Sequence, residues 1–415
     1  MYRSAISHLQ YVASFSIALL VLAMVVMPAA QAQTGQILHS FRGGPSDGSS
    51  PEGLIAVDSA GNVYGSTPFG GNGGGPCAPL DGCGMVFRAL NRNGSFIYTP
   101  LYLFHGGNDG GQPLAGVTLG PDGTVYGTTL FGGGNGCGGN GCGTVFRLTP
   151  PPTFCRMVLC GWDETVIYRY TGGSGPFNFF GGVVVDAGGN VYGASFNGGN
   201  FGGGAVYKLS PAGGGNYTET TLYSFTGAHD GAEPAGDLAM DAAGNIYGTA
   251  EYGGPDGFGT VFKLVREAEG YSFQLLYAFT NGADGNSPQG SVVLDSAGNL
   301  YGTSGNGGGV FQITPSGVYS LIDPILGGLQ APISIDSAGN IYSTTYGGGQ
   351  NDDGSVFEDT YSSGTWTHHV IFSFGGGFGG LPLSDVGFDS SGNMYVTSTF
   401  GGQGGAQGTL VQITP

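Results

Sequence analysis

The stretch Asp58-Ser59-Ala60-Gly61-Asn62-Val63-Tyr64-Gly65 decides the fold, because the chain repeats it six more times. A degraded copy begins at Gly120, and closer copies begin at Asp186, Asp241, Asp295, Asp336 and Asp389. The tyrosines of the seven copies lie 41 to 66 residues apart, at Tyr64, Tyr126, Tyr192, Tyr247, Tyr301, Tyr342 and Tyr395. Recurrence at this spacing is the sequence signature of a protein built from repeated structural units.

Each copy has room for four short strands, which are clearest in the fourth copy. Its expected strands are residues 237–241, 246–252, 260–264 and 273–279. Apolar residues alternate with small or polar ones along these segments, as in half-buried β-strands. Four-stranded units repeated around a central channel are the blades of a β-propeller.

The two ends of the repeated region complement each other. The last copy stops after its third strand, residues 408–413, whereas residues 37–41 match the fourth-strand pattern Leu222-Tyr223-Ser224-Phe225. The N-terminal strand can therefore complete the last blade and leave no unpaired sheet edge. We predict an all-β fold, a seven-bladed β-propeller with four strands per blade, closed by the N-terminal strand.

Residues 1–32 have the layout of a secretory signal peptide. An apolar stretch, residues 11–27, is followed by Ala30-Gln31-Ala32, the Ala-x-Ala pattern that precedes signal-peptidase cleavage. An uncleaved membrane anchor is the alternative interpretation. We expect cleavage after Ala32, one propeller domain over residues 33–415, and secretion to the periplasm or the medium.

The charge balance argues against several classes of partner. The chain has 10 Lys and Arg against 28 Asp and Glu, a formal net charge of −18 at pH 7. Such a surface repels phosphate backbones and anionic lipid headgroups. We expect a monomer with no nucleic-acid partner and no membrane association after cleavage. A carbohydrate or protein ligand stays open, and we expect no cofactor and no metal.

Six cysteines fall into three local pairs, Cys77/Cys83, Cys137/Cys142 and Cys155/Cys160. In an exported protein this spacing predicts three small-loop disulfides. Zinc binding is the alternative, but no His lies near the pairs and their spacing differs from that of a zinc ribbon.

The run from Tyr126 to Leu148 contains Tyr-Gly-Thr-Thr, paired glycines and Gly-Thr-Val-Phe-Arg-Leu, and a similar run extends from Tyr247 to Leu264. These runs resemble the tandem repeats of the choice-of-anchor GloVer-containing proteins. The resemblance covers residues 36–415 and implies an exported protein built from repeats, without implying a particular activity. The family name refers to varied C-terminal sorting anchors, whereas this chain ends at Ile413-Thr414-Pro415. We therefore expect release rather than attachment to the cell surface.

Two repeated elements carry carboxylates. The Asp-x-x-Gly-Asn turns could be repeated calcium sites, but Asp commonly bonds its own turn backbone, and no EF-hand loop is found. Asp-Gly-x-x-Pro lies in the links between blades, where a turn explains it, at residues 47–51, 109–113, 230–234 and 284–288. We favour the structural interpretation of both elements, and ligand binding is the alternative for the second.

An aromatic residue recurs at the end of the second strand, at Phe69, Phe131, Phe196, Tyr252, Tyr346 and Phe400. Packing between neighbouring blades is the interpretation we favour. A set of stacking platforms for sugars is the alternative.

Function in a repeat protein tends to lie where one copy departs from the pattern. The clearest departure combines His229, Asp230 and Glu233, in the link into the fourth blade, with Glu251 and Tyr252, in the loop after its second strand. Blade topology places both segments on the face that carries the long loops. Two carboxylates and a His suit acid–base work on a sugar. Loop polarity alone is the alternative explanation.

Catalytic signatures are otherwise missing from the sequence. It contains no Gly-x-Ser-x-Gly elbow, no His-Glu-x-x-His helix and no phosphate-binding loop, and we predict no catalytic residue. His368 and His369 would point to opposite faces of a strand, which argues against a joint metal site. We predict a secreted module that binds a glycan or a protein on the long-loop face. A secreted carbohydrate-active hydrolase or lyase, and a structural envelope or matrix protein, are the alternatives, because propellers serve all three purposes.

Overall fold

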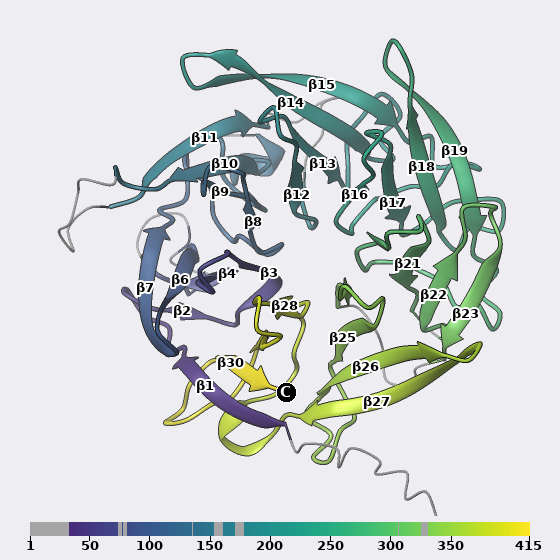
Figure 1. Ribbon diagram of the computed structural model, residues 1–415. Coiled ribbons are helices and arrows are strands. Elements are labelled where there is room, and N and C mark those ends of the chain that lie inside the picture. Colours follow the sequence, from purple (N-terminus) through teal and green to yellow (C-terminus); the bar gives the residue numbers. More distant parts are fainter. Residues whose placement is uncertain are drawn as a thin grey trace, which may run out of the picture. The chain divides into compact units, whose positions relative to one another are not determined.

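The computed structural model describes residues 33–73, 77, 81–134, 136–152, 161–170, 178–305, 307–324 and 331–415. Residues Gln33–Pro415 form one compact unit. Its described residues build seven four-stranded antiparallel sheets, which follow one another around a ring (Figure 1). The predicted seven-bladed β-propeller is confirmed.

The first four blades run from the ring centre outward in chain order. Blade 1 contains β3 (Glu52–Val57), β4 (Val63–Thr67), β6 (Met85–Arg92) and β7 (Ser95–Leu103). Blade 2 contains β8 (Thr118–Leu119), β9 (Val125–Thr129), β10 (Thr144–Thr149) and β11 (Asp163–Arg169). Blade 3 contains β12 (Val183–Val185), β13 (Val191–Ser195), β14 (Ala205–Gly213) and β15 (Asn216–Ser224). Blade 4 contains β16 (Ala239–Met240), β17 (Ile246–Ala250), β18 (Thr260–Arg266) and β19 (Tyr271–Ala278).

The last three blades include the one that joins the ends of the unit. Blade 5 contains β20 (Val293–Leu294), β21 (Leu300–Thr303), β22 (Val310–Ile313) and β23 (Tyr319–Asp323). Blade 6 contains β24 (Ser334–Ile335), β25 (Ile341–Thr345), β26 (Ser355–Ser362) and β27 (Thr365–Ser373). Blade 7 contains β28 (Gly387–Phe388), β29 (Met394–Ser398), β30 (Thr409–Thr414) and, as its outer strand, β1 (Thr34–Ser40). The predicted closure by the N-terminal strand is therefore confirmed.

Two short strands and two short helices lie outside the seven blades in the described residues. Strands β2 (Gly48–Ser49) and β5 (Phe69–Gly70) pair with each other and fasten the link into blade 1 to the end of its second strand. Short 3-10 helices span Cys137–Gly139 and Gly376–Phe378. Among the described residues, no helix has the length and hydropathy needed to cross a membrane.

The inner strands are shorter than the sequence pattern suggested. In blade 4, β16 covers only two of the five residues expected for the first strand, and β17 ends at Ala250 rather than at residue 252. The outer strand begins at Tyr271, two residues earlier than expected. Strands near the axis have less room than strands at the rim, so the alternating pattern continues into residues that leave the sheet.

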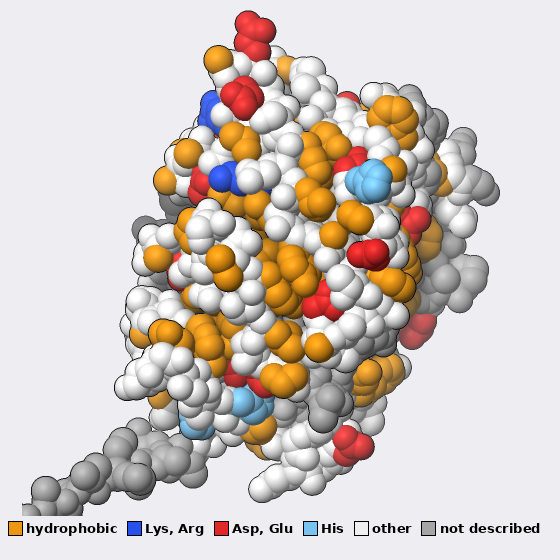
Figure 2. Space-filling view, turned by 90° about the vertical axis from the view of Figure 1, so that its right-hand side faces the viewer, with side chains coloured by type: hydrophobic (Ala, Val, Ile, Leu, Met, Phe, Trp, Pro, Cys, Tyr) orange, Lys and Arg blue, Asp and Glu red, His pale blue; other side chains and the backbone are white. Residues whose placement is uncertain are grey.

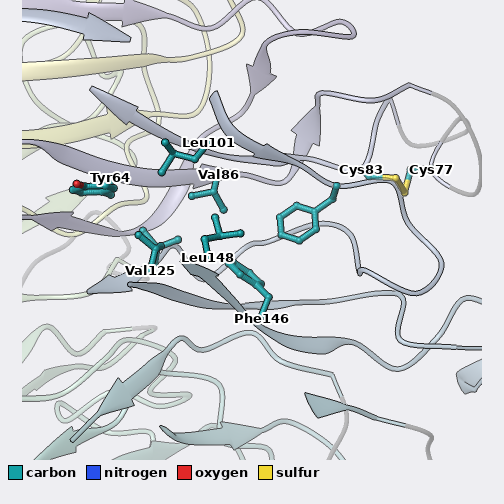
Figure 3. Packing of buried hydrophobic residues seen from close by; sticks show 10 residues of the cluster. Tyr64, Cys77, Cys83, Val86, Leu101, Val125, Phe146 and Leu148 are labelled. Atoms are coloured by element: carbon teal, nitrogen blue, oxygen red, sulfur yellow. A yellow bond between two sulfur atoms is a disulfide. The ribbon is translucent and has the colours of Figure 1, made fainter. Parts of the chain in front are cut away.

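Hydrophobic cores lie between successive blades. One cluster joins Tyr64, Val86 and Leu101 of blade 1 to Phe146 and Leu148 of blade 2 (Figure 3). The third strand supplies a fully buried aromatic ring in most copies: Phe87, Phe146, Tyr207, Phe262, Phe311 and Phe357. The glycine opposite this ring is required by space in blade 4, since a Cβ on Gly248 would lie 2.6 Å from the Phe262 ring. Each blade is thus held mainly by its neighbours.

Two of the three predicted disulfides are confirmed, Cys77–Cys83 and Cys137–Cys142. The predicted pair Cys155–Cys160 lies outside the described residues. The surface matches the composition. On one side of the ring, hydrophobic and uncharged side chains cover most of the area, acidic side chains are scattered among them, and Lys and Arg are rare (Figure 2).

Candidate functional site

The Asp-x-x-Gly-Asn turns are held together by their own aspartates. Asp241 Oδ1 accepts hydrogen bonds from the backbone N–H of Ala243, at 3.0 Å, and of Asn245, at 2.9 Å. Its Oδ2 accepts from the side-chain amide of Asn245, at 2.7 Å, and from the hydroxyl of Tyr247, at 3.0 Å. The same four contacts recur at Asp58, Asp186, Asp295, Asp336 and Asp389. These carboxylates are satisfied by the turn itself, which supports the structural interpretation.

Asp230, one of the five predicted site residues, also has a structural role. The Tyr223 hydroxyl donates to its Oδ2 at 2.9 Å, and the Thr226 backbone N–H donates to the same oxygen at 2.8 Å. The Asp230 backbone carbonyl accepts from the Thr260 hydroxyl at 3.1 Å. Asp284 repeats the two carboxylate contacts in the next link. Asp230 therefore positions the link, and both of its carboxylate oxygens accept hydrogen bonds there.

Glu233 and Glu251 are brought together by a backbone contact between the link and the end of β17. The N–H of Glu251 donates to the Glu233 carbonyl at 3.2 Å, and Ala232 and Tyr252 exchange two further hydrogen bonds, at 2.7 and 3.1 Å. The corresponding bond joins Leu130 to Gln112, Phe196 to Asn178 and Thr399 to Leu381 in blades 2, 3 and 7. None of these three pairs contains two acids, so the paired carboxyl groups are particular to blade 4 among them.

Glu251 is the more buried residue of this pair. Only 5% of its surface is exposed, and its Oε1 accepts a hydrogen bond of 2.7 Å from the Gln289 amide. A hydrogen bond to Glu251 and the charge of that carboxylate raise the pKa of Tyr252. Burial, together with the nearby charge of Glu251, raises the pKa of Glu233. One carboxyl group of the pair thus holds its proton more tightly than an ordinary glutamate does.

Three of the predicted residues line one cavity of about 450 Å³, which we call the blade-4 cavity. Its lining consists of Phe180, Phe196, Glu233, Ala235, Glu251, Tyr252 and Gln289. The rings of Phe180 and Tyr252 are 42% and 46% exposed, so two aromatic surfaces are open to solvent beside the two carboxyl groups. Phe180 also packs edge-on against Phe196, with ring centroids 5.1 Å apart.

His229 does not belong to this cavity. Its side chain is exposed and is not part of the cavity lining. Of the five predicted site residues, Glu233, Glu251 and Tyr252 therefore line one cavity, and Asp230 and His229 are not part of its lining.

The interpretation of the strand-end aromatics as packing residues is wrong for half of them. Tyr252, Tyr346 and Phe400 are 46%, 42% and 56% exposed. Sequence position alone does not separate these exposed rings from Phe69, Phe131 and Phe196, which are partly buried.

Carboxyl groups near the ring centre were not found from the sequence. A second cavity of about 230 Å³ is lined by residues at the start of the inner strands, among them Glu52, Asp237 and Ser291. It shares Phe180, Ala235 and Gln289 with the blade-4 cavity, so the two adjoin. Asp237 accepts hydrogen bonds from the Ser291 hydroxyl and the Gly182 N–H.

Burial raises the pKa values of the central acids. Burial raises the pKa of Glu52 to about 7. Burial, only partly offset by a hydrogen bond of 2.7 Å from the Ile55 N–H and reinforced by the charge of Asp237, raises the pKa of Asp385 to about 7. Asp237 and Asp385 each stand three residues after a link proline, Pro234 or Pro382. Aligning the copies on that proline would have identified these two aspartates from the sequence.

A third group of titratable residues, at the boundary of blades 5 and 6, was also missed. His368 Nδ1 lies 2.7 Å from Asp323 Oδ2 and 2.9 Å from Asp359 Oδ1. We call Asp323, Asp359 and His368 the blade 5–6 cluster. The two carboxylates raise the pKa of His368 to about 9. From the sequence, His368 was considered as a ligand only together with His369, and its two carboxylate partners were not identified.

The ring of seven four-stranded blades, with its cavities at the inner strand ends, defines a β-propeller with a candidate ligand site. Residues 138–327 match the family model described as the Gloeobacter/Verrucomicrobia repeat. The chain therefore contains the GloVer repeat over these residues, and the resemblance drawn from the sequence is confirmed. Among curated proteins, no relative was found by sequence.

Solved structures with the same fold are distant in sequence. A streptogramin B lyase structure matches with a TM-score of 0.59 and 14% identity, covering 92% of this chain and 97% of that one. Virginiamycin B lyase from Staphylococcus aureus matches with a TM-score of 0.57 and 13% identity, covering 92% and 99%. The WD40 β-propeller domain of Doa1 matches with a TM-score of 0.55 and 13% identity, covering 91% and 96%. At this level of identity the likeness establishes the propeller fold.

Proposed function

We propose that this protein is an exported binding module that holds a sugar in the blade-4 cavity. The observation that carries the proposal is the pairing of Glu233 and Glu251 beside the exposed rings of Phe180 and Tyr252. The volume of about 450 Å³ lies in the range of small-ligand sites, roughly 300–1,000 Å³.

The chemistry of the lining favours a carbohydrate. Carboxylates accept hydrogen bonds from hydroxyl groups, and aromatic rings offer flat apolar surfaces to the C–H face of a sugar. Gln289 adds an amide that both donates and accepts, although its N–H group is partly engaged by Glu251. A net charge of −18 disfavours acidic polysaccharides, so we propose a neutral or amino sugar as the ligand.

Export forms part of the same proposal. The layout of residues 1–32 is that of a signal peptide. The disulfides Cys77–Cys83 and Cys137–Cys142 are compatible with an oxidising compartment outside the cytosol. Glycans are abundant there, which suits a binding module without a membrane-spanning helix in its described residues.

A panel of neutral and amino-sugar polysaccharides, tested for retention of the purified protein, is the first experiment. We expect retention on at least one of them, and we expect Tyr252→Ala and Glu251→Gln each to weaken it about 10- to 100-fold. Tyr346→Ala is the matched control, because Tyr346 is an equally exposed ring at the strand end of blade 6. Equal losses in Tyr252→Ala and Tyr346→Ala, or no retention on any polysaccharide, would contradict the proposal.

Catalysis in the same cavity is the second candidate function. It is favoured by the raised pKa of Glu233 beside Glu251, because acid–base enzymes commonly separate the pKa values of two neighbouring carboxyl groups. A hydrolase or lyase would release shortened products from the retained polysaccharide. Glu233→Gln would then abolish product release and leave retention largely intact. Retention without products in the unchanged protein supports the binding module instead.

A further inference from the structure

At four blade boundaries a residue of one outer strand contacts a residue of the next outer strand. At three boundaries both residues are flat rings that stack. Tyr223 stacks on Phe273 with centroids 4.7 Å apart, Tyr277 on Tyr319 at 3.9 Å, and His39 on Tyr98 at 3.5 Å. The first member of each pair faces the third strand of its own blade, opposite Val206, Val261 or Leu410.

The boundary of blades 5 and 6 departs from this pattern at both positions. Asp323, opposite Val310, takes the place of the first ring, and His368, opposite Asp359, takes the place of the second. Instead of stacked rings, the boundary contains a carboxylate and an imidazole 2.7 Å apart.

Asp359, the third member of the blade 5–6 cluster, also differs from its counterparts in the other blades. Asp359 pairs with Ile341, the first residue of β25. The residues at this position in the other blades are buried and apolar: Ala89, Leu148, Leu209, Leu264, Ile313 and Ile413. Asp359 is as buried as they are, with 1% of its surface exposed. A carboxylate is costly there unless it has a compensating partner.

The partners within the described residues do not fully compensate Asp359. The imidazole of His368 contacts Asp359 Oδ1. Asp359 Oδ2 is buried and accepts no hydrogen bond from any described residue. The charge of Asp323 acts on the same carboxyl group. Two carboxylates therefore face one imidazole, and one oxygen is left unsatisfied.

We propose that Asp323, Asp359 and His368 form a binding site for a divalent transition-metal ion of the zinc or manganese class. One potential ligand atom from each residue lies within 4.8 Å of the others. Carboxylate oxygens and an imidazole nitrogen are the donors that such ions take. His368 is the exposed member, so the ion can enter from the rim and keep a water ligand. Bound there, it joins β23 of blade 5 to β26 and β27 of blade 6 where the stacked rings are missing.

The test is metal binding by the purified protein, prepared without a histidine tag and stripped with a chelator. Titration calorimetry with Zn²⁺, Mn²⁺ and Ca²⁺ would be compared with the metal content of the protein after dialysis. We expect one tight Zn²⁺ or Mn²⁺ ion per chain, weaker Ca²⁺ binding, and an unfolding temperature that rises with metal concentration.

Two kinds of variant separate this site from other surface carboxylates and histidines. His368→Gln keeps an exposed polar side chain and should fold, and we expect it to weaken the tight site by about 100-fold or more. The triple variant D323Y/D359L/H368F introduces the ring pair found at three other boundaries and a leucine in place of Asp359, and it should lose the site while keeping the fold. His369→Ala is the control, because His369 pairs with Glu358 outside the cluster, and it should bind as the unchanged protein does.

Two outcomes would overturn the proposal. One is the lack of any saturable binding in the stripped protein, which would make the cluster a metal-free ion-pair network. Another is a tight site that survives unchanged in both His368→Gln and the triple variant, which would place the ion elsewhere.

Discussion

The ring of His39 lies flat on the ring of Tyr98, with 3° between their planes and 3.5 Å between their centroids. Asp47 contacts both, at 3.1 Å from His39 Nε2 and 3.0 Å from the Tyr98 hydroxyl. His39 belongs to β1, which completes blade 7, and Tyr98 belongs to blade 1. His39, Tyr98 and Asp47 thus hold the last blade against the first.

Deletion of residues 36–41 should damage the whole ring. It removes the outer strand of blade 7, the His39 contacts and Phe41, which is completely buried. Replacement of Phe41 by Ala alone should cost about 3–5 kcal/mol, and the deletion should cost more and promote aggregation through the exposed edge of β30. Thermal unfolding followed by circular dichroism measures the loss of stability in both variants. Thr34→Ala, at an exposed position of the same strand, is the control. A deletion variant that unfolds at the unchanged temperature would contradict closure by β1.

Loss of an aspartate should matter more in a complete turn than in the degraded one. Asp241 accepts four hydrogen bonds, so Asp241→Ala should lower the free energy of unfolding by about 1–3 kcal/mol. Asp122 of the degraded copy accepts a hydrogen bond from the Thr124 N–H at 3.0 Å but lacks the Asn and Tyr contacts of Asp241, so Asp122→Ala should cost less. Urea unfolding compares the two. Sugar retention should stay unchanged in both, because these turns do not line the blade-4 cavity. Equal losses of stability would show that the turn carboxylates are dispensable.

The central acids should make the protein less stable as pH rises towards neutrality. The pKa of Asp385 is raised from its ordinary 3.8 to about 7, so the folded state binds its proton more tightly than the unfolded state does. The resulting stabilisation is complete below about pH 4 and is lost as pH rises through 7, with a slope of up to about 1.4 kcal/mol per pH unit. Asp385→Asn replaces the titrating carboxyl group by an amide and so removes this contribution to the pH dependence.

Urea unfolding between pH 5 and 8 checks the direction. We expect a shallower pH dependence in Asp385→Asn than in the unchanged protein. Parallel curves would mean that Asp385 has the same pKa in the folded and unfolded states. Glu52→Gln tests the second group, whose pKa of about 7 predicts a loss over the same range.

The cysteines outside the two described bridges should pair with each other. Cys155 and Cys160 are the remaining two of six, and they are separated by five residues as Cys137 and Cys142 are. Peptide mapping under non-reducing conditions should find three local pairs. A peptide that joins Cys155 or Cys160 to any of the other four cysteines would refute this pairing.

The fold could be predicted because it depends on features that recur. The Asp-x-x-Gly-Asn turn, the strand after it and the Gly-x-Val-Phe strand each appear several times, so a single ambiguous copy did not matter. The blade-4 cavity was predicted in part, since Glu233, Glu251 and Tyr252 lie in segments that blade topology brings together. The sequence did not show the structural contacts of Asp230, because a carboxylate in a loop and a carboxylate that accepts a hydrogen bond from Tyr223 look alike in sequence.

The remaining residues depend on contacts across blade boundaries, which follow from strand register. Asp359 and His368 face each other because β26 and β27 pair as they do, and Asp323 reaches them from the preceding blade. Comparison of the copies position by position would have singled out Asp359, because the other copies have Leu, Ile or Ala there. It would not have supplied the distance to Asp323.

The pairing of β1 with β30 sets the order in which the molecule can mature. Thr34 and Thr414, which are hydrogen-bonded in the finished ring, are separated by 380 positions along the chain. During synthesis β1 is made before any other strand of the propeller and waits for a partner that is made last, so six blades can assemble while the seventh is still open. Contacts of such long range are slow to form, and an open blade can capture the same strand of a neighbouring molecule. Keeping newly made copies apart until β30 has been synthesised would therefore favour closure of each ring within its own chain.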